Sequence, residues 1–479
     1  MNEKIQIIFG LLGGLAVFIY GMNMMSECLQ KAAGDKMKSI LALLTKNPLL
    51  GVLAGALTTA VLQSSSATTV MAIGFVSAGL MTLPQAISII FGANIGTTMT
   101  AQIIAFKISD YIYVIIFIGF LISFVTKSEK VKSIGQTIFA FGLLFLGIET
   151  MGDVMKPLAS SPIFTDLIGR VAHIPVLGVA VGTVMTLVVQ SSSATIAVLQ
   201  NFASQPGPDG VTSILGLAGA IPILLGDNIG TTITALLASI GQSKDAKRTA
   251  VAHCIFNISG CVLFIWFVKP FAALIQNISP KGPEIEAISR QIANAHTVFN
   301  ITMTLIWVCL IKLMVKIVMT LIPDGKKGVE DPGSPIYLDE NIISQPAAAL
   351  QLVAKEIFRM SDQVGDILKK TIELVKNEEV KSIDGLKENG EQVERLGKCI
   401  TEYLAALFSS GSLTEQQAAQ TASLMCVLSD VERMGTLSVE MAECMLERSD
   451  RKYKYTPEAM DELQKSLKVL NKMFCDSLK

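Results

Sequence analysis

The sequence predicts an all-α, polytopic membrane protein with two inverted repeats that contain re-entrant or broken helices, followed by a cytoplasmic antiparallel helical bundle. Three observations predict this architecture. The 479 residues have a mean hydropathy of +0.53, which is too apolar for an ordinary soluble protein. Residues 1–322 carry 19 basic and 13 acidic side chains, whereas the much shorter segment 323–479 carries 20 and 27. Finally, two long, polar but almost uncharged stretches repeat one another.

The charge distribution divides the chain into three parts. We expect a transmembrane domain over 1–322, a linker rich in proline and glycine over 323–346, and a soluble helical domain over 347–479. The first apolar run lacks the basic flank of a secretory signal and is expected to be retained as a helix. Apolar runs suited to a hydrocarbon core of about 30 Å lie at 5–27, 111–126, 134–153, 249–270 and 296–322.

The stretches 48–106 and 174–241 are apolar but rich in glycine, serine, threonine, glutamine and asparagine. The first contains no charged residue, and the second contains only Asp209 and Asp227. Irregular backbone is tolerated at membrane depth only where it is buried in protein or lines a cavity. Both stretches are therefore expected to be broken or re-entrant helices beside an internal site.

The two polar stretches are copies of one another. The motif QSSSAT at 63–68 returns at 190–195 with an offset of 127 residues, and the motif GxNIGTT at 92–98 returns at 226–232 with an offset of 134. The repeats thus run over about 5–127 and 134–270, and an additional helix follows at 296–322. If each polar hairpin enters and leaves on one side, each copy crosses the membrane three times, so the second copy is inverted.

The distribution of basic residues favours this inverted arrangement. Lysine and arginine are more frequent in the loops 28–47, 127–132 and 244–248 than in the corresponding loop 154–173 or around Lys107. Because basic loops tend to remain in the cytoplasm, these loops and the C-terminal domain are expected there. The protein is accordingly expected to be a multi-pass protein of the inner (plasma) membrane.

The repeated polar residues suit an oxyanion accompanied by small cations. Serine hydroxyls, glutamine amides and N–H groups at helix N-termini donate hydrogen bonds to an anion, and hydroxyl and carbonyl oxygens coordinate Na⁺. Neither stretch contains a lysine or arginine that could offset an anion's charge, so a bound cation is expected to do so. Asp227 is the first choice for a Na⁺ ligand or coupling group. Ala93 stands at the corresponding position of the first repeat, so the two half-sites are expected to be unequal.

Other features have structural explanations at least as good as functional ones. Glycines spaced by four in each copy are expected to let helices pack closely. The pattern A-H-x-x-F-N occurs at 252–257 and 295–300, where buried hydrogen bonds between helices or the handling of a proton or substrate would both explain it. Glu149 and Asp153 lie near a helix end and are expected to face water. The eight scattered cysteines predict neither a zinc site nor a disulfide framework.

The duplicated motifs resemble those of the type II sodium-dependent phosphate cotransporters, including bacterial members with a fused cytoplasmic tail. The resemblance covers about 10–270 through specific motifs. It implies that inorganic phosphate is bound by Gln63, Ser64, Ser65, Ser66, Gln190, Ser191, Ser192 and Ser193. Together with the choice of Asp227, it implies sodium sites formed among Thr68, Asn94, Thr97, Thr98, Thr195, Asp227, Asn228, Thr231 and Thr232. No cofactor beyond Na⁺ as coupling ion is expected.

The C-terminal part resembles a PhoU-like helical domain. Apolar residues recur at helical spacing over 346–375 and 384–407, and the segment SDVERMG at 429–435 resembles the signature D-x-E-R-x-G. Thr436 and Glu440 depart from the family pattern, so the resemblance carries no expectation of metal binding over to this segment.

The sequence therefore predicts sodium-coupled symport of inorganic phosphate by alternating access, with a regulatory cytoplasmic domain. The expected partners are phosphate, Na⁺, the lipid membrane and a cytoplasmic regulatory protein that binds the C-terminal domain, but no nucleic acid. The sequence contains no P-loop, HExxH motif or triad spacing, so catalysis is not expected. Three alternatives stay open: a phosphate exporter that uses the same site, a phosphate-sensing signalling protein, and a Na⁺-coupled carrier of another small solute.

Overall fold

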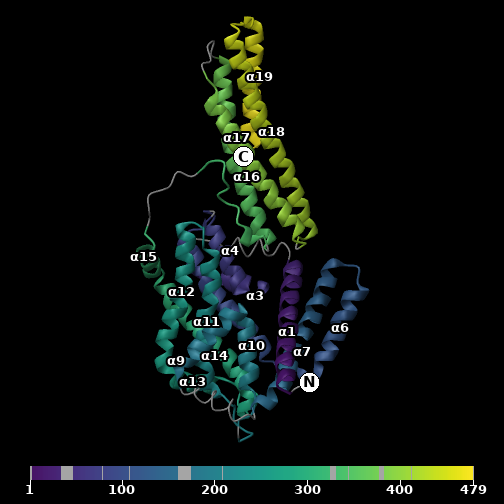
Figure 1. Ribbon diagram of the computed structural model, residues 1–479, viewed down its shortest axis with the longest axis vertical. Coiled ribbons are helices and arrows are strands. Elements are labelled where there is room, and N and C mark those ends of the chain that lie inside the picture. The colour runs from purple at the N-terminus through teal and green to yellow at the C-terminus, as the bar shows by residue number, and fades with distance from the viewer. Residues whose placement is uncertain are drawn as a thin grey trace. The chain divides into compact units, whose positions relative to one another are not determined.

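The computed structural model describes residues 3–33, 47–77, 79–106, 108–159, 174–207, 209–323, 331–343, 345–376, 382–411 and 413–477. These residues form helices and connecting turns, and no β-strand occurs among them (Figure 1). The chain divides into two compact units, Met1–Asp324 and Gly325–Lys479, each of which is described by itself.

The first unit is built from apolar helices. Among the described residues, six segments are long and apolar enough to cross a membrane: α1 (Glu3–Ala33), α5 (Leu83–Ile104), α7 (Glu129–Ala159), α11 (Gly216–Ala238), the run of α12 (Lys244–Phe264) and α13 (Val268–Ile278), and α14 (Glu284–Cys309). Shorter apolar helices are α3 (Pro48–Leu62), α4 (Ser65–Ser77), α6 (Ile112–Val125), α9 (Pro175–Val189) and α10 (Ser192–Ala203). The prediction of an all-α polytopic membrane protein is confirmed.

Two of the expected helices are divided. The segment 296–322 belongs to α14, which begins twelve residues earlier at Glu284, and to α15 (Ile311–Leu321), with a non-helical residue at Leu310 between them. Likewise, the run 249–270 is interrupted by a 3₁₀ turn at Ile265–Phe267 before α13. In both α13 and α15, buried residues recur at helical spacing on one face. A search for continuous apolar runs does not separate such helices from the neighbouring spans.

The first helices of the two repeats, α1 and α7, pack along one another (Figure 1). Glycines make this close approach possible. A Cβ atom on Gly147 would lie 2.6 Å from the carbonyl oxygen of Gly14, and one on Gly21 would lie 2.8 Å from the backbone nitrogen of Leu144. Small residues at such crossings let two backbones approach each other in a membrane helix pair.

The same glycine-mediated packing occurs in both repeats between the broken helix and the polar helix that follows. A Cβ atom on Gly55 of α3 would lie 2.1 Å from the carbonyl oxygen of Ile89 in α5, and one on Gly182 of α9 would lie 2.0 Å from that of Ile223 in α11. The glycines spaced by four therefore have the packing role that was expected of them. Because their positions correspond, α3 is held on α5 and α9 on α11 in the same way.

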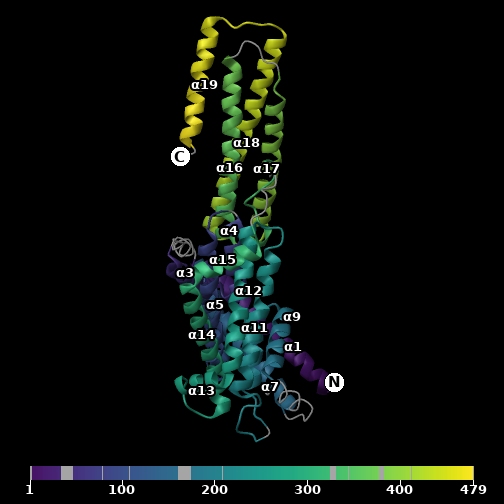
Figure 2. The same ribbon diagram turned by 90° about the vertical axis from the view of Figure 1, so that its left-hand side faces the viewer.

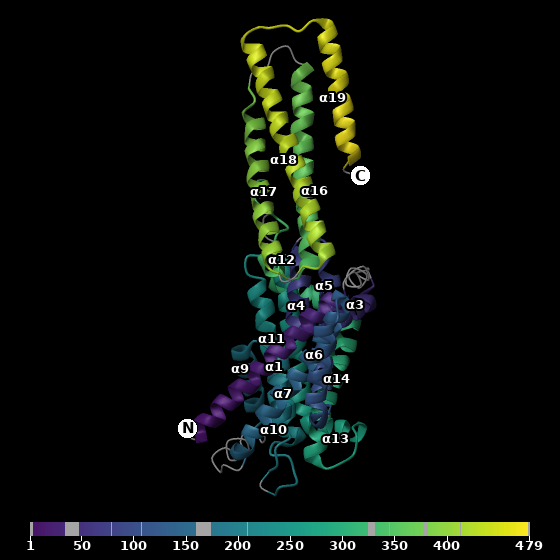
Figure 3. The same cartoon turned by 90° about the vertical axis from the view of Figure 1, so that its right-hand side faces the viewer.

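The part of the second unit that the structure describes contains a 3₁₀ turn at Glu340–Ile342 and four α-helices: α16 (Pro346–Lys376), α17 (Asp384–Ser409), α18 (Glu415–Asp450) and α19 (Pro457–Ser477). Figure 2 and Figure 3 show α16, α17 and α18 side by side, with α19 alongside α16. The predicted amphipathic helices over 346–375 and 384–407 are thus present. Their buried residues include Ile357, Val364, Leu396 and Leu404, which form one apolar interior.

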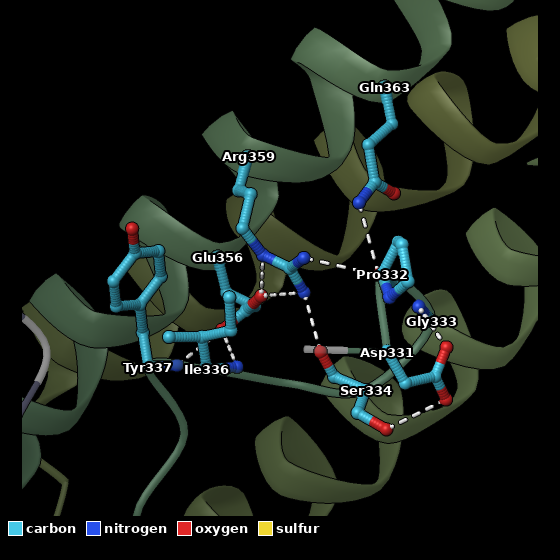
Figure 4. Close-up of polar contacts among 9 residues, drawn as sticks. All are labelled: Asp331, Pro332, Gly333, Ser334, Ile336, Tyr337, Glu356, Arg359 and Gln363. Atoms are coloured by element: carbon cyan, nitrogen blue, oxygen red, sulfur yellow. Dashed lines mark hydrogen bonds and ion pairs between the residues drawn. The ribbon is translucent and has the colours of Figure 1, made fainter. Parts of the chain in front are cut away.

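Part of the segment expected to be a linker is bound to the second unit. We call residues 331–343 the strap. The side chain of Glu356, which is fully buried, accepts hydrogen bonds from the backbone N–H groups of Ile336 (2.9 Å) and Tyr337 (2.6 Å) in the strap. Arg359, one turn later on α16, donates to the carbonyl oxygens of Pro332 and Ser334 and pairs with Glu356 (Figure 4). The strap therefore belongs structurally to the C-terminal unit.

Candidate functional site

The QSSS motifs lie at two breaks with the same backbone geometry. Helix α3 ends at Leu62, and Gln63 adopts the left-handed conformation (φ 51°, ψ 25°); α9 ends at Val189, and Gln190 adopts φ 54°, ψ 25°. A non-glycine residue in this conformation costs about 1–2 kcal/mol, and such residues concentrate at functional sites. At about 1.5 Å per residue, α3 and α4 are each too short to cross a core of about 30 Å. The predicted broken helices are present in both repeats.

Each break opens the N-terminus of the following helix. The Ser64 hydroxyl accepts a hydrogen bond from the backbone N–H of Ala67 (3.1 Å), and the Ser191 hydroxyl accepts one from that of Ala194 (3.3 Å). These two serines thus cap α4 and α10, and their own O–H groups remain available as donors. The N–H groups at the beginning of a helix have no carbonyl partner within that helix, so those that begin α4 and α10 can donate hydrogen bonds to an anion.

The two sides of each break are joined by a threonine pair. Thr59 of α3 donates a hydrogen bond to Thr68 of α4 (2.8 Å), and the hydroxyl oxygens of Thr186 and Thr195 lie 3.1 Å apart at the corresponding positions of the second repeat. All four side chains are buried. Thr59 and Thr186 were not predicted from the sequence, although their spacing of 127 residues equals that of the QSSSAT motifs.

The second repeat adds a buried carboxylate to its threonine pair. Thr186 also lies 2.6 Å from Oδ1 of Asp227 and donates a hydrogen bond to it. The side chain of Asp227 is 0% exposed, and its Oδ2 atom has no hydrogen-bond partner. A buried carboxylate oxygen without a donor is costly unless a cation or proton binds it. The first repeat has Ala93 at this position, so the two half-sites are unequal in charge.

The asparagines of the two GxNIGTT motifs also differ. Asn94 donates to the carbonyl oxygen of Ile90 in its own helix (2.9 Å), whereas Oδ1 of Asn228 lies 3.1 Å from Nε2 of His296 on α14. His296 is fully buried, and the Nδ2 atom of Asn228 has no partner. A buried hydrogen bond between helices was one of the two explanations for the A-H-x-x-F-N pattern, and His296 makes such a bond.

The threonines of these motifs bond mainly to their own helices. Thr98 donates to the carbonyl oxygen of Ile95 (2.7 Å), and Thr232 does the same to Ile229 (2.7 Å). Thr231 donates to the carbonyl oxygen of Asp227 (2.9 Å). Their oxygen lone pairs remain free to accept, which is what coordination of Na⁺ requires. Thr97 is buried in the same helix as Thr98.

The structure brings each QSSS helix against the polar helix of the other repeat. Helix α4 packs on α11, where Thr234 donates to the Ser66 hydroxyl (3.1 Å), and α10 packs on α5, where the Gln200 amide donates to the carbonyl oxygen of Ala101 (3.1 Å). Within the first repeat, Thr100 donates to the Gln63 side chain (3.0 Å). The motifs of both repeats therefore lie on helices that pack against one another across the two repeats. Thr100 and Thr234 were not predicted from the sequence.

Comparison with protein-family models agrees with this geometry. The model described as Na⁺/Pi-cotransporter matches the chain twice, at residues 17–153 and 149–279, and the model described as PhoU domain matches residues 357–445. The chain belongs to the Na⁺/Pi-cotransporter family. The two matches correspond to the two repeats, so the resemblance noted from the sequence is confirmed.

Relatives with curated names point to phosphate transport. "Uncharacterized protein YqeW" of Bacillus subtilis is 35% identical over 263 residues, which cover 55% of this chain and 83% of that protein. "Putative inorganic phosphate export protein YjbB" of Escherichia coli K12 is 22% identical over 443 residues, 92% of this chain and 78% of that protein. Human "Sodium-dependent phosphate transport protein 2B" is 34% identical over 142 residues, 28% of this chain and 19% of that protein. No solved structure matches this chain.

Proposed function

We propose that this member of the family moves inorganic phosphate across the inner membrane together with Na⁺, by alternating access to one site formed by both repeats. The observation that carries the proposal is the duplicated break. Two helix N-termini start at left-handed glutamines and serine triplets, and each helix packs on the polar helix of the opposite repeat. Together, two helix N-termini offer about one elementary positive charge without a cationic side chain.

In this proposal, phosphate is bound by donors from both breaks. The hydroxyl groups of Ser65, Ser66, Ser192 and Ser193, the O–H groups of the two capping serines, the amides of Gln63 and Gln190, and the N–H groups that begin α4 and α10 supply hydrogen bonds to its oxygens. Na⁺ is bound by neighbouring oxygen atoms of Thr68, Asn94, Thr195 and Asn228 and of the four GTT threonines. Asp227 supplies the single negative charge.

The repeats are proposed to have opposite orientations in the membrane. Lys130 and Lys132 lie at the beginning of α7, and Lys244, Lys247 and Arg248 lie in the first two turns of α12. In this orientation these residues and the C-terminal unit would lie in the cytoplasm. A green fluorescent protein fused after residue 479 should therefore fluoresce in cells, and an alkaline phosphatase fused there should be inactive. The opposite pair of results would overturn this orientation.

A regulatory partner of the C-terminal unit remains part of the proposal.

Phosphate uptake into proteoliposomes tests the main proposal. The full-length protein is reconstituted, and ³²P-phosphate uptake is measured with Na⁺ or choline outside, for the wild type, Ser65→Ala, Ser192→Ala and the control Ser123→Ala. Ser123 lies on α6 and donates to a carbonyl oxygen of its own helix, away from the breaks. We expect Na⁺-driven uptake in the wild type and control and loss in both site variants. Equal uptake with Na⁺ and choline would refute the coupling.

Export is the second candidate direction for the same site. It is favoured by the relatives that cover 92% of this chain and carry the name of phosphate export proteins. Loading the vesicles with ³²P-phosphate and reversing the Na⁺ gradient distinguishes the two directions. A symporter releases phosphate only when Na⁺ leaves with it, whereas an exporter that does not use Na⁺ releases it under either gradient.

A further inference from the structure

Helix α14 follows the two repeats in the sequence but packs on the polar helix of each, α5 and α11. On α5, the carbonyl oxygen of Phe91 accepts a hydrogen bond from Thr304 (3.3 Å). On α11, Oδ1 of Asn228 lies 3.1 Å from Nε2 of His296. Because α14 lies outside the repeated part of the chain, its contacts can make equivalent residues of the two repeats behave differently.

The asparagines of the two GxNIGTT motifs differ in this way. Asn94 donates its Nδ2 group to the carbonyl oxygen of Ile90, four residues earlier in its own helix (2.9 Å). In the second repeat, Oδ1 of Asn228 contacts His296, and Nδ2 of Asn228 is buried without a hydrogen-bond partner among the described residues. The contact with His296 therefore keeps the N–H₂ group of Asn228 from turning back onto its own helix, as that of Asn94 does.

The histidine is the donor in this contact. An amide oxygen can only accept hydrogen bonds, so the hydrogen between the two atoms is assigned to Nε2 of His296. The ring is 0% exposed, and its other nitrogen, Nδ1, has no partner among the described residues. The hydrogen bond that the ring makes is thus the one that orients the Asn228 amide.

His253 on α12 provides an internal comparison, because it stands at the same place in the other copy of A-H-x-x-F-N. In each copy the asparagine, Asn257 or Asn300, donates to the backbone carbonyl oxygen of its histidine (3.1 and 3.0 Å). His253 is also buried, but neither of its ring nitrogens has a hydrogen-bond partner among the described residues. The two copies thus share the bond within the helix, and His296 adds the contact with a GxNIGTT motif.

The N–H₂ group of Asn228 suits an anion. A buried donor without an acceptor costs free energy, and an N–H group cannot coordinate a cation, whereas the oxygens of an oxyanion accept hydrogen bonds. Neither polar stretch contains a lysine or arginine, so neutral donors must hold an anion there. Helix α11, which carries Asn228, packs on both α4 and α10, the helices that begin at the two breaks. The unpaired donor therefore lies on a helix that contacts both halves of the proposed phosphate site.

We propose that His296 is a positioning residue for phosphate: by holding Oδ1 of Asn228, it leaves the N–H₂ group of that side chain to donate hydrogen bonds to a phosphate oxygen. This inference rests on the proposed function and adds to it a donor from outside the QSSS motifs, oriented by a helix from outside the repeats. Oδ1 of Asn228 retains a second lone pair, so this role is compatible with the Na⁺ contact proposed above.

Phosphate uptake by the full-length protein in proteoliposomes tests this role. Two quantities are measured: the phosphate concentration for half-maximal uptake at saturating Na⁺, and the Na⁺ concentration for half-maximal uptake at saturating phosphate. His296→Leu and His296→Phe remove the donor, His296→Gln supplies a side-chain amide that can donate in place of Nε2, and His253→Leu is the matched control. A thermal melting curve of each variant checks that it is folded.

We expect His296→Leu and His296→Phe to raise the phosphate concentration about ten-fold, the effect of one hydrogen bond to a charged group, and the Na⁺ concentration less than about three-fold. His296→Gln should restore most of the phosphate affinity, and His253→Leu should change neither concentration. In a protein that already carries Asn228→Ala, His296→Leu should add no further change, because the histidine acts through Asn228.

An unchanged phosphate concentration in either folded variant that lacks the donor would overturn the inference. Equal increases in both concentrations, or no recovery in His296→Gln, would reduce His296 to a packing role and overturn it as well. Each of these results leaves the proposed function intact, since the wild type still takes up phosphate with Na⁺. Absence of Na⁺-driven uptake by the wild type would refute the proposed function itself, and this inference with it.

Discussion

Replacing Thr186 by valine removes the hydrogen bond from Thr186 to the buried Asp227 carboxylate and nearly preserves the shape of the side chain. The bond is 2.6 Å long, and the other carboxylate oxygen has no partner. A hydrogen bond to a charged group contributes about 1.5–3 kcal/mol. If Asp227 binds Na⁺ in its charged form, the bond from Thr186 stabilises that form, and its loss favours the neutral carboxyl group, which binds Na⁺ poorly. The Na⁺ concentration for half-maximal uptake should then rise by about ten- to hundred-fold, since about 1.4 kcal/mol corresponds to a factor of ten.

The first repeat supplies a matched control for this substitution. Thr59 occupies the equivalent position, is equally buried, and donates to Thr68 at 2.8 Å, but Ala93 replaces the carboxylate. Thr59→Val therefore removes a bond between neutral groups, which contributes about 0.5–1.5 kcal/mol, and it should change the Na⁺ dependence much less. The assay is ³²P-phosphate uptake into proteoliposomes at graded Na⁺. Equal shifts in the two variants, or no shift in Thr186→Val, would refute the role assigned to Asp227.

Three further predictions concern helix packing in the first unit, the second break, and the strap of the second unit. Gly182→Ala should lower the melting temperature by several degrees, because its Cβ would lie 2.0 Å from a carbonyl oxygen of α11, whereas Gly13→Ala, whose Cβ meets nothing within 4 Å, should not. Gln190→Gly should relieve about 1 kcal/mol of left-handed strain, so thermal stability should not fall although uptake is lost; a lower melting temperature would contradict the strain. Glu356→Ala should cost about 3–5 kcal/mol by leaving Arg359 and two N–H groups without their carboxylate, and it should expose the strap to limited proteolysis. The same digestion pattern in Glu356→Ala and in the exposed control Asp362→Ala would contradict it.

Much of the fold could be predicted because the signal lies in consecutive residues. The stretches 48–106 and 174–241 are too apolar for loops and too rich in serine and glycine for ordinary transmembrane helices, which predicts broken helices. The sequence repeat shows that the two stretches correspond to each other. The break itself falls at the Gln-Ser pair of each motif, as the structure has it. The placement of the motifs at helix breaks could therefore be predicted from the sequence, whereas their binding chemistry stays a prediction.

The contacts between helices could not be predicted, because they depend on which faces of helices far apart in the sequence pack together. A pattern of neighbouring residues does not contain this information. The bond from Thr186 to Asp227 joins residues 41 positions apart, and the bond between Asn228 and His296 joins residues 68 apart. Glu149 and Asp153 were expected to face water because they lie near a helix end; Asp153 is exposed, whereas Glu149 is half-buried and its Oε2 atom is enclosed. Because apolar length alone was considered, α15 was merged with α14 in the predicted run 296–322, and most of α13 was left outside the predicted run 249–270.

The inequality of the two repeats gives a physical reason for the proposed coupling of phosphate transport to Na⁺. The duplicated breaks provide donors for an anion, but Asp227 brings a carboxylate close to the second break. Thr186, which donates a hydrogen bond to Asp227, lies one helical turn before Gln190. At about 8 Å and an effective dielectric constant of about 20, that charge would oppose a monovalent anion by roughly 2 kcal/mol. In the proposed mechanism, a Na⁺ bound at the carboxylate oxygen that has no partner cancels this repulsion, which would raise phosphate affinity about thirty-fold. Asp227→Ala removes the same repulsion, so we expect this variant to bind phosphate with a weaker dependence on Na⁺ than the wild type.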